Sequence, residues 1–164
     1  MRARRSSRPA GEAARTDPQA ARTAAITLLA RRDFASAELR EKLLEKAFDD
    51  VTAAAVIAEL TREGVLDDAR YAQNYVAYHA GRGQGPQRIA VQLRRHGLAA
   101  ALVDAALDGG PDWDALARKV RSARFGRLPP ASWPEKSRQA RFLRYRGFSS
   151  DHIRAATGAD PDAD

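Results

Sequence analysis

The side chains best suited to acid–base chemistry or metal binding are three histidines and one pair of adjacent aspartates. The histidines, His79, His96 and His152, lie far apart in the sequence, and no two of them have the spacing of metal ligands. Cysteine is absent, which excludes disulfides, thiolate metal sites and thiol nucleophiles. We therefore expect structural or surface roles for the histidines, and we expect no metal and no cofactor.

The aspartate pair, Asp67 and Asp68, could act as a general acid and base. It directly precedes a predicted helix, however, where acidic side chains cap free N–H groups and interact favourably with the helix dipole. The segment from Gly81 to Gly85 is similar to a phosphate-binding loop, but it lacks the Lys-Ser/Thr of a P-loop and follows a helix. It predicts an interhelical turn. No Ser-His-Asp or comparable constellation can be assembled, so the sequence favours a protein that is not an enzyme.

Basic side chains recur along several predicted helices with almost no acidic residues between them. In the helix from about Pro134 to Arg146, arginines at spacings of three and four face away from the apolar Phe142 and Leu143. A run of charge is usually a solvated helix face, but ion pairs within a helix cannot account for cations that lack acidic neighbours. The candidate residues for binding a partner or DNA are Arg82, Arg88, Arg95, Arg118, Lys119, Arg121, Arg124, Lys136, Arg138, Arg141, Arg144 and Tyr145.

The net charge of +7 is distributed unevenly along the chain. Residues 18–69 carry three more acidic than basic side chains, whereas residues 70–111 have an excess of three bases and residues 112–157 an excess of seven. This polarity favours an oriented binding surface for a polyanion or an acidic protein. A genomic bias toward Ala and Arg would explain the use of Arg in place of Lys, but not the excess of bases over acids.

These charges lie on a chain whose apolar pattern repeats about every fifty residues. Apolar residues correspond at this offset in three sets: Leu39 with Ile89; Leu43 with Leu93 and Leu143; and Ala53 with Val103 and Ile153. Self-similarity at a fixed period of this size indicates stacked supersecondary units. Within each repeat, apolar side chains three and four residues apart predict three helices. We therefore predict an all-α fold of three tandem three-helix repeats, helix-turn-helix-like units in an elongated, curved stack.

The charge and the repeat together divide the chain into five predicted segments. They are a flexible basic N-terminal tail (1–19), an acidic repeat 1 (20–66), a basic repeat 2 (67–109), a strongly basic repeat 3 (110–157) and an acidic C-terminal tail (158–164). No apolar run approaches the length of a membrane span, and no signal sequence is evident. We expect no contact with a membrane and a cytoplasmic location.

Three local features predict how the helices begin and end. Ser36 is expected to N-cap the second helix of repeat 1. Gly97 and Gly147 follow the second helix of repeats 2 and 3, where a left-handed glycine ends a helix at low cost. Ala47 stands in place of this glycine in repeat 1, so we expect a looser or differently wound turn there.

Four segments carry a resemblance to a known family. They begin at Ser36, Gly64, Gly85 and Phe142, and they consist of Ser-Ala-Glu-Leu, Gly-Val-Leu-Asp-Asp-Ala-Arg-Tyr-Ala, Gly-Pro-Gln-Arg-Ile (with Leu93 and Gly97 after it) and Phe-Leu-Arg-Tyr-Arg-Gly-Phe-Ser. In this order and at these separations they resemble RecX, the family of bacterial regulators of the RecA recombinase. The resemblance covers about residues 20–157, and Ala47 departs from the glycine usual in the family.

The resemblance implies a non-enzymatic protein that binds the RecA nucleoprotein filament, typically in its helical groove. It implies that the protein restrains ATP hydrolysis, strand exchange and co-protease activity, and so regulates DNA repair, recombination and the SOS response. Contact with DNA is then expected through the filament or directly, and we expect a monomer.

A stand-alone DNA-binding protein of the basic helix-turn-helix type is the alternative that the residues leave open. Its affinity for DNA would be electrostatic and would fall steeply with salt. Platforms on which single-stranded bases could stack are few, because most aromatic residues lie on predicted core stripes such as Tyr71, Tyr75 and Tyr78. Tyr145 and Trp133 are the candidates for such stacking.

Overall fold

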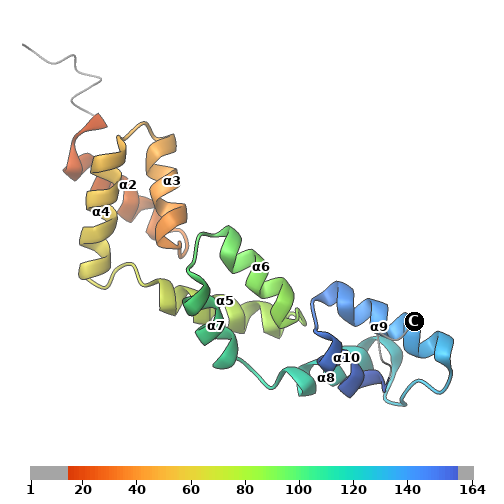
Figure 1. The fold of residues 1–164 in the computed structure, drawn as a ribbon. Coiled ribbons are helices and arrows are strands. Elements are labelled where there is room, and N and C mark those ends of the chain that lie inside the picture. The colour runs from red at the N-terminus through yellow and green to blue at the C-terminus, as the bar shows by residue number, and fades with distance from the viewer. Residues whose placement is uncertain (1–14, 159–164) are drawn as a thin grey trace, which may run out of the picture. The chain divides into compact units, whose positions relative to one another are not determined.

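Helices of eight to fourteen residues, joined by short connections, build the protein (Figure 1). A computed structural model describes residues 15–158, and this part of the chain has no strand. Its helices are α2 (Pro18–Leu29), α3 (Ser36–Glu45), α4 (Asp50–Arg62), α5 (Asp68–Gly81), α6 (Pro86–Arg95), α7 (Ala100–Asp108), α8 (Trp113–Phe125), α9 (Trp133–Arg146) and α10 (Ser150–Thr157). The all-α fold of three-helix repeats is confirmed. No helix among residues 15–158 is both long and apolar enough to cross a membrane.

The chain divides between Asp68 and Ala69 into two compact units, called unit 1 and unit 2 below. Helices α2 to α4 belong to unit 1, and α6 to α10 belong to unit 2 together with nearly all of α5. Most of the basic tail predicted for residues 1–19 lies outside the described residues, although Pro18 and Gln19 already belong to α2. Of the predicted acidic tail, only Gly158 is described.

The core positions follow the fifty-residue offset predicted from the sequence. Complete burial is shared by all three sets of corresponding apolar residues: Leu39 and Ile89; Leu43, Leu93 and Leu143; and Ala53, Val103 and Ile153. The second and third helices of each repeat therefore present the same face to its core. Burying a leucine of this kind contributes about 1.5–3 kcal/mol, so these positions contribute strongly to holding each repeat together.

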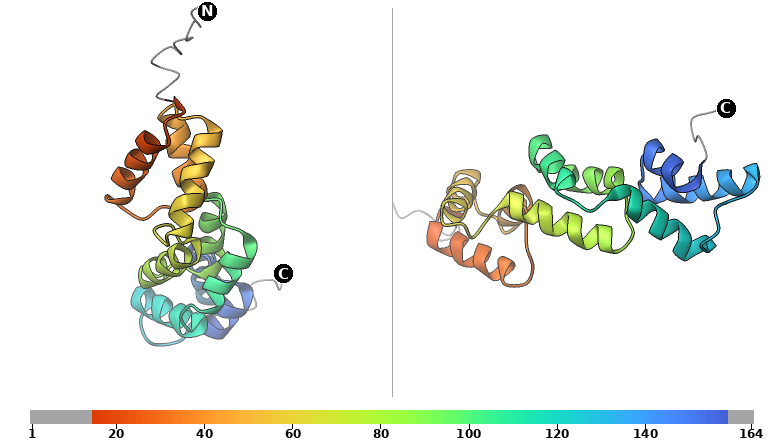
Figure 2. Two further views of the ribbon diagram at one scale, coloured as in Figure 1. Left: turned by 90° about the vertical axis from the view of Figure 1, so that its left-hand side faces the viewer. Right: turned by 90° about the horizontal axis from the view of Figure 1, so that it is seen from below.

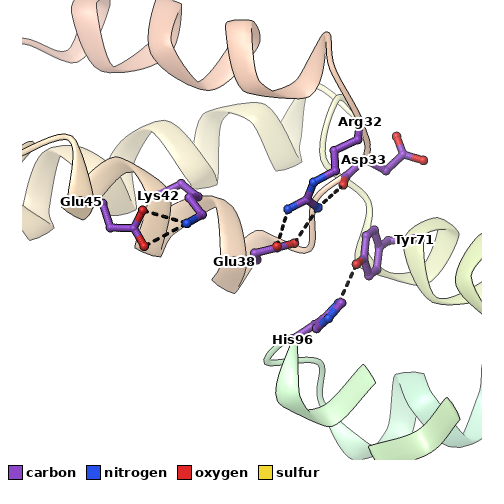
Figure 3. Close-up of polar contacts among 7 residues, drawn as sticks. All are labelled: Arg32, Asp33, Glu38, Lys42, Glu45, Tyr71 and His96. Atoms are coloured by element: carbon purple, nitrogen blue, oxygen red, sulfur yellow. Dashed lines mark hydrogen bonds and ion pairs between the residues drawn. The ribbon is translucent and has the colours of Figure 1, made fainter. Parts of the chain in front are cut away.

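Several charged side chains of unit 1 form ion pairs with one another. Arg22 contacts Glu59 at 3.1 Å and Glu63 at 2.9 Å, which links α2 to the end of α4. Two further pairs appear in Figure 3: Arg32 with Glu38 at 2.6 Å, and Lys42 with Glu45 at 2.8 Å. Arg40 pairs with Asp50. Because these groups are partly exposed, each pair contributes no more than about 1 kcal/mol.

The turn after α3 has the same geometry as its counterparts in the other repeats, so the prediction of a different turn was wrong. Ala47 adopts a φ of 66°, beside 82° at Gly97 and 94° at Gly147. The reason is the hydrogen bond that closes the turn, in which the N–H of Phe48 donates to the carbonyl of Leu43 at 3.2 Å. The equivalent bonds in repeats 2 and 3 are 3.3 and 3.1 Å long. Ala47 thus bears the steric cost that glycine avoids.

The start of α3 also differs from its prediction. Ala35 occupies the N-cap position without a side-chain bond, and Ser36 is the first helical residue. The N–H of Ser36 instead donates to Oδ1 of Asp68 at 2.8 Å. Asp68 therefore satisfies a free amide of α3 while standing in the first turn of α5, where its charge suits the helix dipole.

The tyrosine stripe predicted for the first helix of repeat 2 is only half right. Tyr71 is buried, but Tyr78 is 59% exposed. The buried face of α5 continues through Val76 and Ala80 instead. Ala72, Val76 and Ala80 are four residues apart and share one face, which packs into the core. Tyr78 follows Val76 by two residues and so points to nearly the opposite side of the helix.

Candidate functional site

Unit 2 carries the predicted binding residues, and most of them are exposed. Arg118, Lys119 and Arg124 lie exposed on α8, and Arg138, Arg141, Arg144 and Tyr145 lie exposed on α9. Arg95 at the end of α6 and Arg82 after α5 are exposed as well, whereas Arg88 and Lys136 are half-buried. Trp133, named above for stacking, is 58% exposed at the start of α9.

Arg121 is buried and is not the exposed binding residue that the sequence predicted. Its side chain is 5% exposed and lies between α8, α9 and the loop that joins them. The guanidinium donates to the carbonyls of Leu128 at 3.0 Å and Arg127 at 3.1 Å, and to Oε1 of Gln139 at 3.3 Å. The spacing of three residues from Arg118 and Arg124 suggested a shared face. Arg121, however, stands four residues after the completely buried Ala117 and therefore lies on the inward face of α8, between Arg118 and Arg124.

A groove in unit 2 gathers cations from three segments of the chain. It encloses a cavity of about 660 Å³, and its lining includes Arg82, Lys119, Arg124, Tyr145 and Arg146. The other candidates do not line it: Arg88, Arg95, Arg118, Lys136, Arg138, Arg141 and Arg144. The structure therefore divides the predicted basic set into a groove, called the basic groove below, and a more widely spread set of residues on α6, α8 and α9.

Aromatic rings hold two of the cations of the basic groove. The guanidinium of Arg82 lies 5.3 Å from the ring centroid of Tyr78 and donates to its hydroxyl at 2.8 Å. The guanidinium of Arg146 lies 5.6 Å from the ring centroid of Phe142. A cation over an aromatic face is stabilised by about 0.5–1 kcal/mol at an exposed site. These contacts restrict the two side chains without neutralising their charge.

Tyr145 stands at the rim of the basic groove and is 77% exposed. Its ring centroid lies 5.7 Å from the guanidinium of Arg88, which also donates to the Tyr145 carbonyl at 3.5 Å. This contact joins α6 to α9, two helices that lie far apart in the sequence. Tyrosine and arginine are the residue types that most often dominate binding energy at protein interfaces.

An apolar pocket of about 390 Å³ adjoins the basic groove. The two share Ala80, Gly81 and Leu116 in their linings, so they form one continuous depression. The pocket is otherwise lined mainly by small aliphatic side chains of α5 and α7 and by the connection to α8, among them Val76 and Ala77. This pocket could not be predicted from the sequence, because it is formed only where three helices meet.

The three histidines lie in packing or capping positions. His96 Nδ1 is 2.7 Å from the hydroxyl of Tyr71 (Figure 3), and His79 stacks on Tyr75 with ring centroids 4.1 Å apart. Burial is the main cause that lowers the pKa of His79, and the positive charge of Arg82 lowers it further. His152 completes a capping box with Ser149 at the start of α10. No three His, Asp or Glu side chains among residues 15–158 are grouped as metal ligands would be.

Two residues of this site were missed from the sequence, Tyr78 and Arg146. Each forms a cation–aromatic pair at a spacing of four residues on one helix or its end: Tyr78 with Arg82, and Phe142 with Arg146. Side chains four apart are neighbours on a helix surface, so this spacing was a signal that could have found them.

Comparison with known families assigns most of the described part of the chain. Models of three RecX domains match in order: the first three-helix domain at residues 21–60, the second at 67–107 and the third at 112–157. The chain belongs to the RecX family. The basic groove and its apolar pocket thus lie in the second and third RecX domains and the segment that joins them.

RecX relatives match over nearly the full chain. The protein named Regulatory protein RecX of Halorhodospira halophila is 44% identical over 147 residues, 89% of this chain and 91% of the relative. Its namesake in Stenotrophomonas maltophilia is 38% identical over 155 residues, 94% and 95% of the two chains. The crystal structure of RecX from Lactobacillus salivarius matches the fold with a TM-score of 0.75 at 20% identity, over 85% of this chain and 93% of that one. These curated relatives are named as regulatory proteins rather than as enzymes.

Proposed function

We propose that this RecX-family protein binds the RecA nucleoprotein filament and inhibits its ATPase, strand-exchange and co-protease activities, thereby regulating DNA repair and recombination. The observation that carries the proposal is the match of all three RecX domains, in order, over residues 21–157. The protein acts in the cytoplasm as a monomer, by binding rather than by catalysis, and it meets DNA mainly through the filament.

The charge distribution supports a partner that presents anionic groups. Unit 1 pairs many of its cations internally, whereas the exposed Arg118, Lys119 and Arg124 of α8 enter none of the ion pairs formed among residues 15–158. Unpaired cations raise the rate at which an anionic partner associates and favour its orientation. The nucleoprotein filament offers such groups on both its protein and its DNA.

A filament ATPase assay tests the proposal directly. ATP hydrolysis by RecA on single-stranded DNA is measured with increasing amounts of this protein, and we expect inhibition at near-stoichiometric or lower ratios. The variant Arg138→Glu/Arg141→Glu/Arg144→Glu reverses an exposed set on α9. It should need about tenfold more protein for half-inhibition, since like charges would then oppose the anionic partner.

The matched control reverses three exposed cations of unit 1, Arg31, Lys46 and Arg62, and changes the net charge by the same amount. We expect a much smaller effect from this control variant. If saturating wild-type protein leaves both ATPase and strand exchange unchanged, the proposal is wrong.

The alternative, a stand-alone DNA-binding protein, keeps one specific observation in its favour, the exposed Tyr145 beside the cations of the basic groove. Affinity for naked single-stranded DNA and for the assembled filament, measured at the same salt concentration, separates the two functions. We expect tighter binding to the filament. Equal affinities that both fall steeply with salt would favour the alternative.

A further inference from the structure

The depression on unit 2 is cationic in one part and apolar in the other. Its basic groove carries Arg82, Lys119, Arg124 and Arg146, and its apolar pocket opens from the same segment at Ala80 and Gly81. No carboxylate of the described residues lines either part. We propose that this depression binds an acidic protein segment that inserts one apolar side chain into the pocket.

The bound segment should be negatively charged, because the cations of the basic groove form no ion pairs with the described residues. None of the ion pairs among residues 15–158 involves its four cations, although unit 2 does pair Arg94 with Asp104 at 3.7 Å elsewhere. A guanidinium presents donors in a rigid fork that matches a carboxylate with two parallel hydrogen bonds. An acidic side chain is therefore the complement that the basic groove lacks.

The cations are also prepared for binding before a partner arrives. Arg82 is fixed on Tyr78 and Arg146 on Phe142, so each has already lost part of its side-chain freedom. Immobilising a long, flexible side chain at an interface costs about 0.5–1.5 kcal/mol. The contacts with Tyr78 and Phe142 already restrict these two arginine side chains in the free protein, so less entropy is lost on binding. Carboxylate partners would restrict them too, but they would also neutralise the positive charge that attracts the bound segment.

The apolar lining of the pocket favours a protein segment over a nucleic acid as the bound partner. Gln73 provides its only polar side chain, and the rest of its lining is aliphatic residues and glycines. The polar edges of a nucleotide base would lose hydrogen bonds to water there, at a cost of about 1–3 kcal/mol for each unpaired group. A leucine or phenylalanine side chain has no such groups and gains from burial. Tyr145, exposed at the rim, adds a residue type that is enriched where protein segments bind tightly.

Applied to the RecA filament, this inference rests on the proposed function and means that the depression contacts protein rather than DNA. The preference of the depression for an acidic, partly apolar peptide can be tested without the filament. The probes are short fluorescent peptides rich in Asp and Glu: one with a central Leu, one with Gly in its place, and one with Asn and Gln replacing the acids. A labelled oligothymidine is the nucleic-acid probe.

Binding of each probe to the full-length protein is followed by fluorescence anisotropy. We expect the acidic Leu peptide to bind tightest. Lys119→Gln/Arg124→Gln, which removes two cations of the basic groove, should weaken the binding of this peptide about tenfold, which corresponds to a loss of about 1.4 kcal/mol for the two contacts together. The matched control, Arg31→Gln/Arg62→Gln, removes two exposed cations of unit 1 and should leave affinity within about twofold.

A second variant tests the apolar pocket. Ala77 is an exposed residue of α5 that lines the pocket, so Ala77→Leu fills it while keeping a good helix former. It should weaken the Leu peptide several-fold and leave the Gly peptide unchanged. If Ala77→Leu weakens both peptides equally, no apolar side chain of the peptide enters the pocket. If the two double variants weaken binding equally, the basic groove is not the binding site. Tighter binding of oligothymidine, lost in the same variants, would assign the depression to nucleic acid instead.

The same variants in the filament ATPase assay keep the two proposals apart. Inhibition that survives while every peptide fails to bind overturns this inference and leaves the proposed function standing. Peptide binding that survives while the wild-type protein fails to inhibit the filament supports this inference and removes the proposed function.

Discussion

The backbone N–H of Gly85 donates a hydrogen bond of 2.8 Å to the carbonyl oxygen of Arg146. The N–H of Gln87 donates to the carbonyl of Gly147 at 3.0 Å in the same way. The free amides at the N-terminal end of α6 are thus satisfied by the free carbonyls at the C-terminal end of α9, which face them in Figure 1. Opposite dipole ends meet at this contact, so it fixes repeat 3 against repeat 2 within unit 2 and forms the framework for the basic groove.

This contact requires glycine on both sides. A Cβ at Gly147 would lie 2.3 Å from Cβ of Arg88, and a Cβ at Gly85 would lie 2.4 Å from the carbonyl carbon of Gly147. We expect Gly85→Ala and Gly147→Ala each to lower the free energy of unfolding of unit 2 by several kcal/mol, measured by urea denaturation. Faster hydrogen exchange at the Gln87 amide should accompany the loss.

Gly64→Ala is the control for this prediction. Gly64 also has a positive φ, 72°, but an added Cβ would meet no atom within 4 Å. It should cost only the backbone strain of about 1–2 kcal/mol. A loss for Gly85→Ala and Gly147→Ala no larger than that of Gly64→Ala would contradict the close contact.

Ala47→Gly should stabilise unit 1. The left-handed φ of 66° costs an alanine about 1–2 kcal/mol, and the greater freedom of glycine in the unfolded chain returns about 0.4–1 kcal/mol of this. A net gain of about 0.5–1 kcal/mol is expected in urea unfolding. Ala54→Gly, at an exposed position inside α4, should instead lose about 1 kcal/mol. Changes of the same sign in both variants would show that Ala47 is not strained.

Arg121 should behave as a structural residue. Arg121→Met leaves the carbonyls of Leu128 and Arg127 without their buried donor, so we expect a loss of about 2–4 kcal/mol in the free energy of unfolding. Arg118→Met, on the exposed side of the same helix, should change stability by less than about 0.5 kcal/mol. If the two variants are equally stable, the buried position of Arg121 is wrong.

His79 should make the protein less stable in mild acid. Burial holds the pKa of His79 below its ordinary 6.5, with help from the charge of Arg82 and against the opposing effect of Gln84. The unfolded chain therefore binds a proton at a higher pH than the folded protein does. The stability that the neutral ring contributes is fully present above the unfolded pKa and is lost as the pH falls below it.

The measurement is thermal unfolding of the wild type and of His79→Gln between about pH 5 and pH 8. Their difference in melting temperature should shift in favour of His79→Gln as the pH falls through about 6.5. A difference that stays constant with pH would mean that His79 does not titrate differently in the folded protein.

The core could be predicted from the sequence because it depends on local spacing, and the family because four segments resemble RecX. A helix buries one stripe, so the residues at positions 43, 93 and 143 had to face inward if the segments were helical at all. The same spacing did not predict Arg121 and Ala47, because contacts outside the regular helices decide the conformation of both residues. A loop carbonyl draws Arg121 inward, and the bond from Phe48 to Leu43 holds Ala47 in a left-handed conformation.

The helices, their fifty-residue repetition and the excess of positive charge toward the C-terminal half thus follow from the order of the amino acids, which also shows the resemblance to RecX. Which of those charges act together depends on how the helices pack. Arg82 meets Arg124 and Arg146 in one groove because the end of α9 bonds to the start of α6 and brings the two repeats into contact. Spacing along one helix reports which side chains share its face, but it carries no information about which faces of different helices meet.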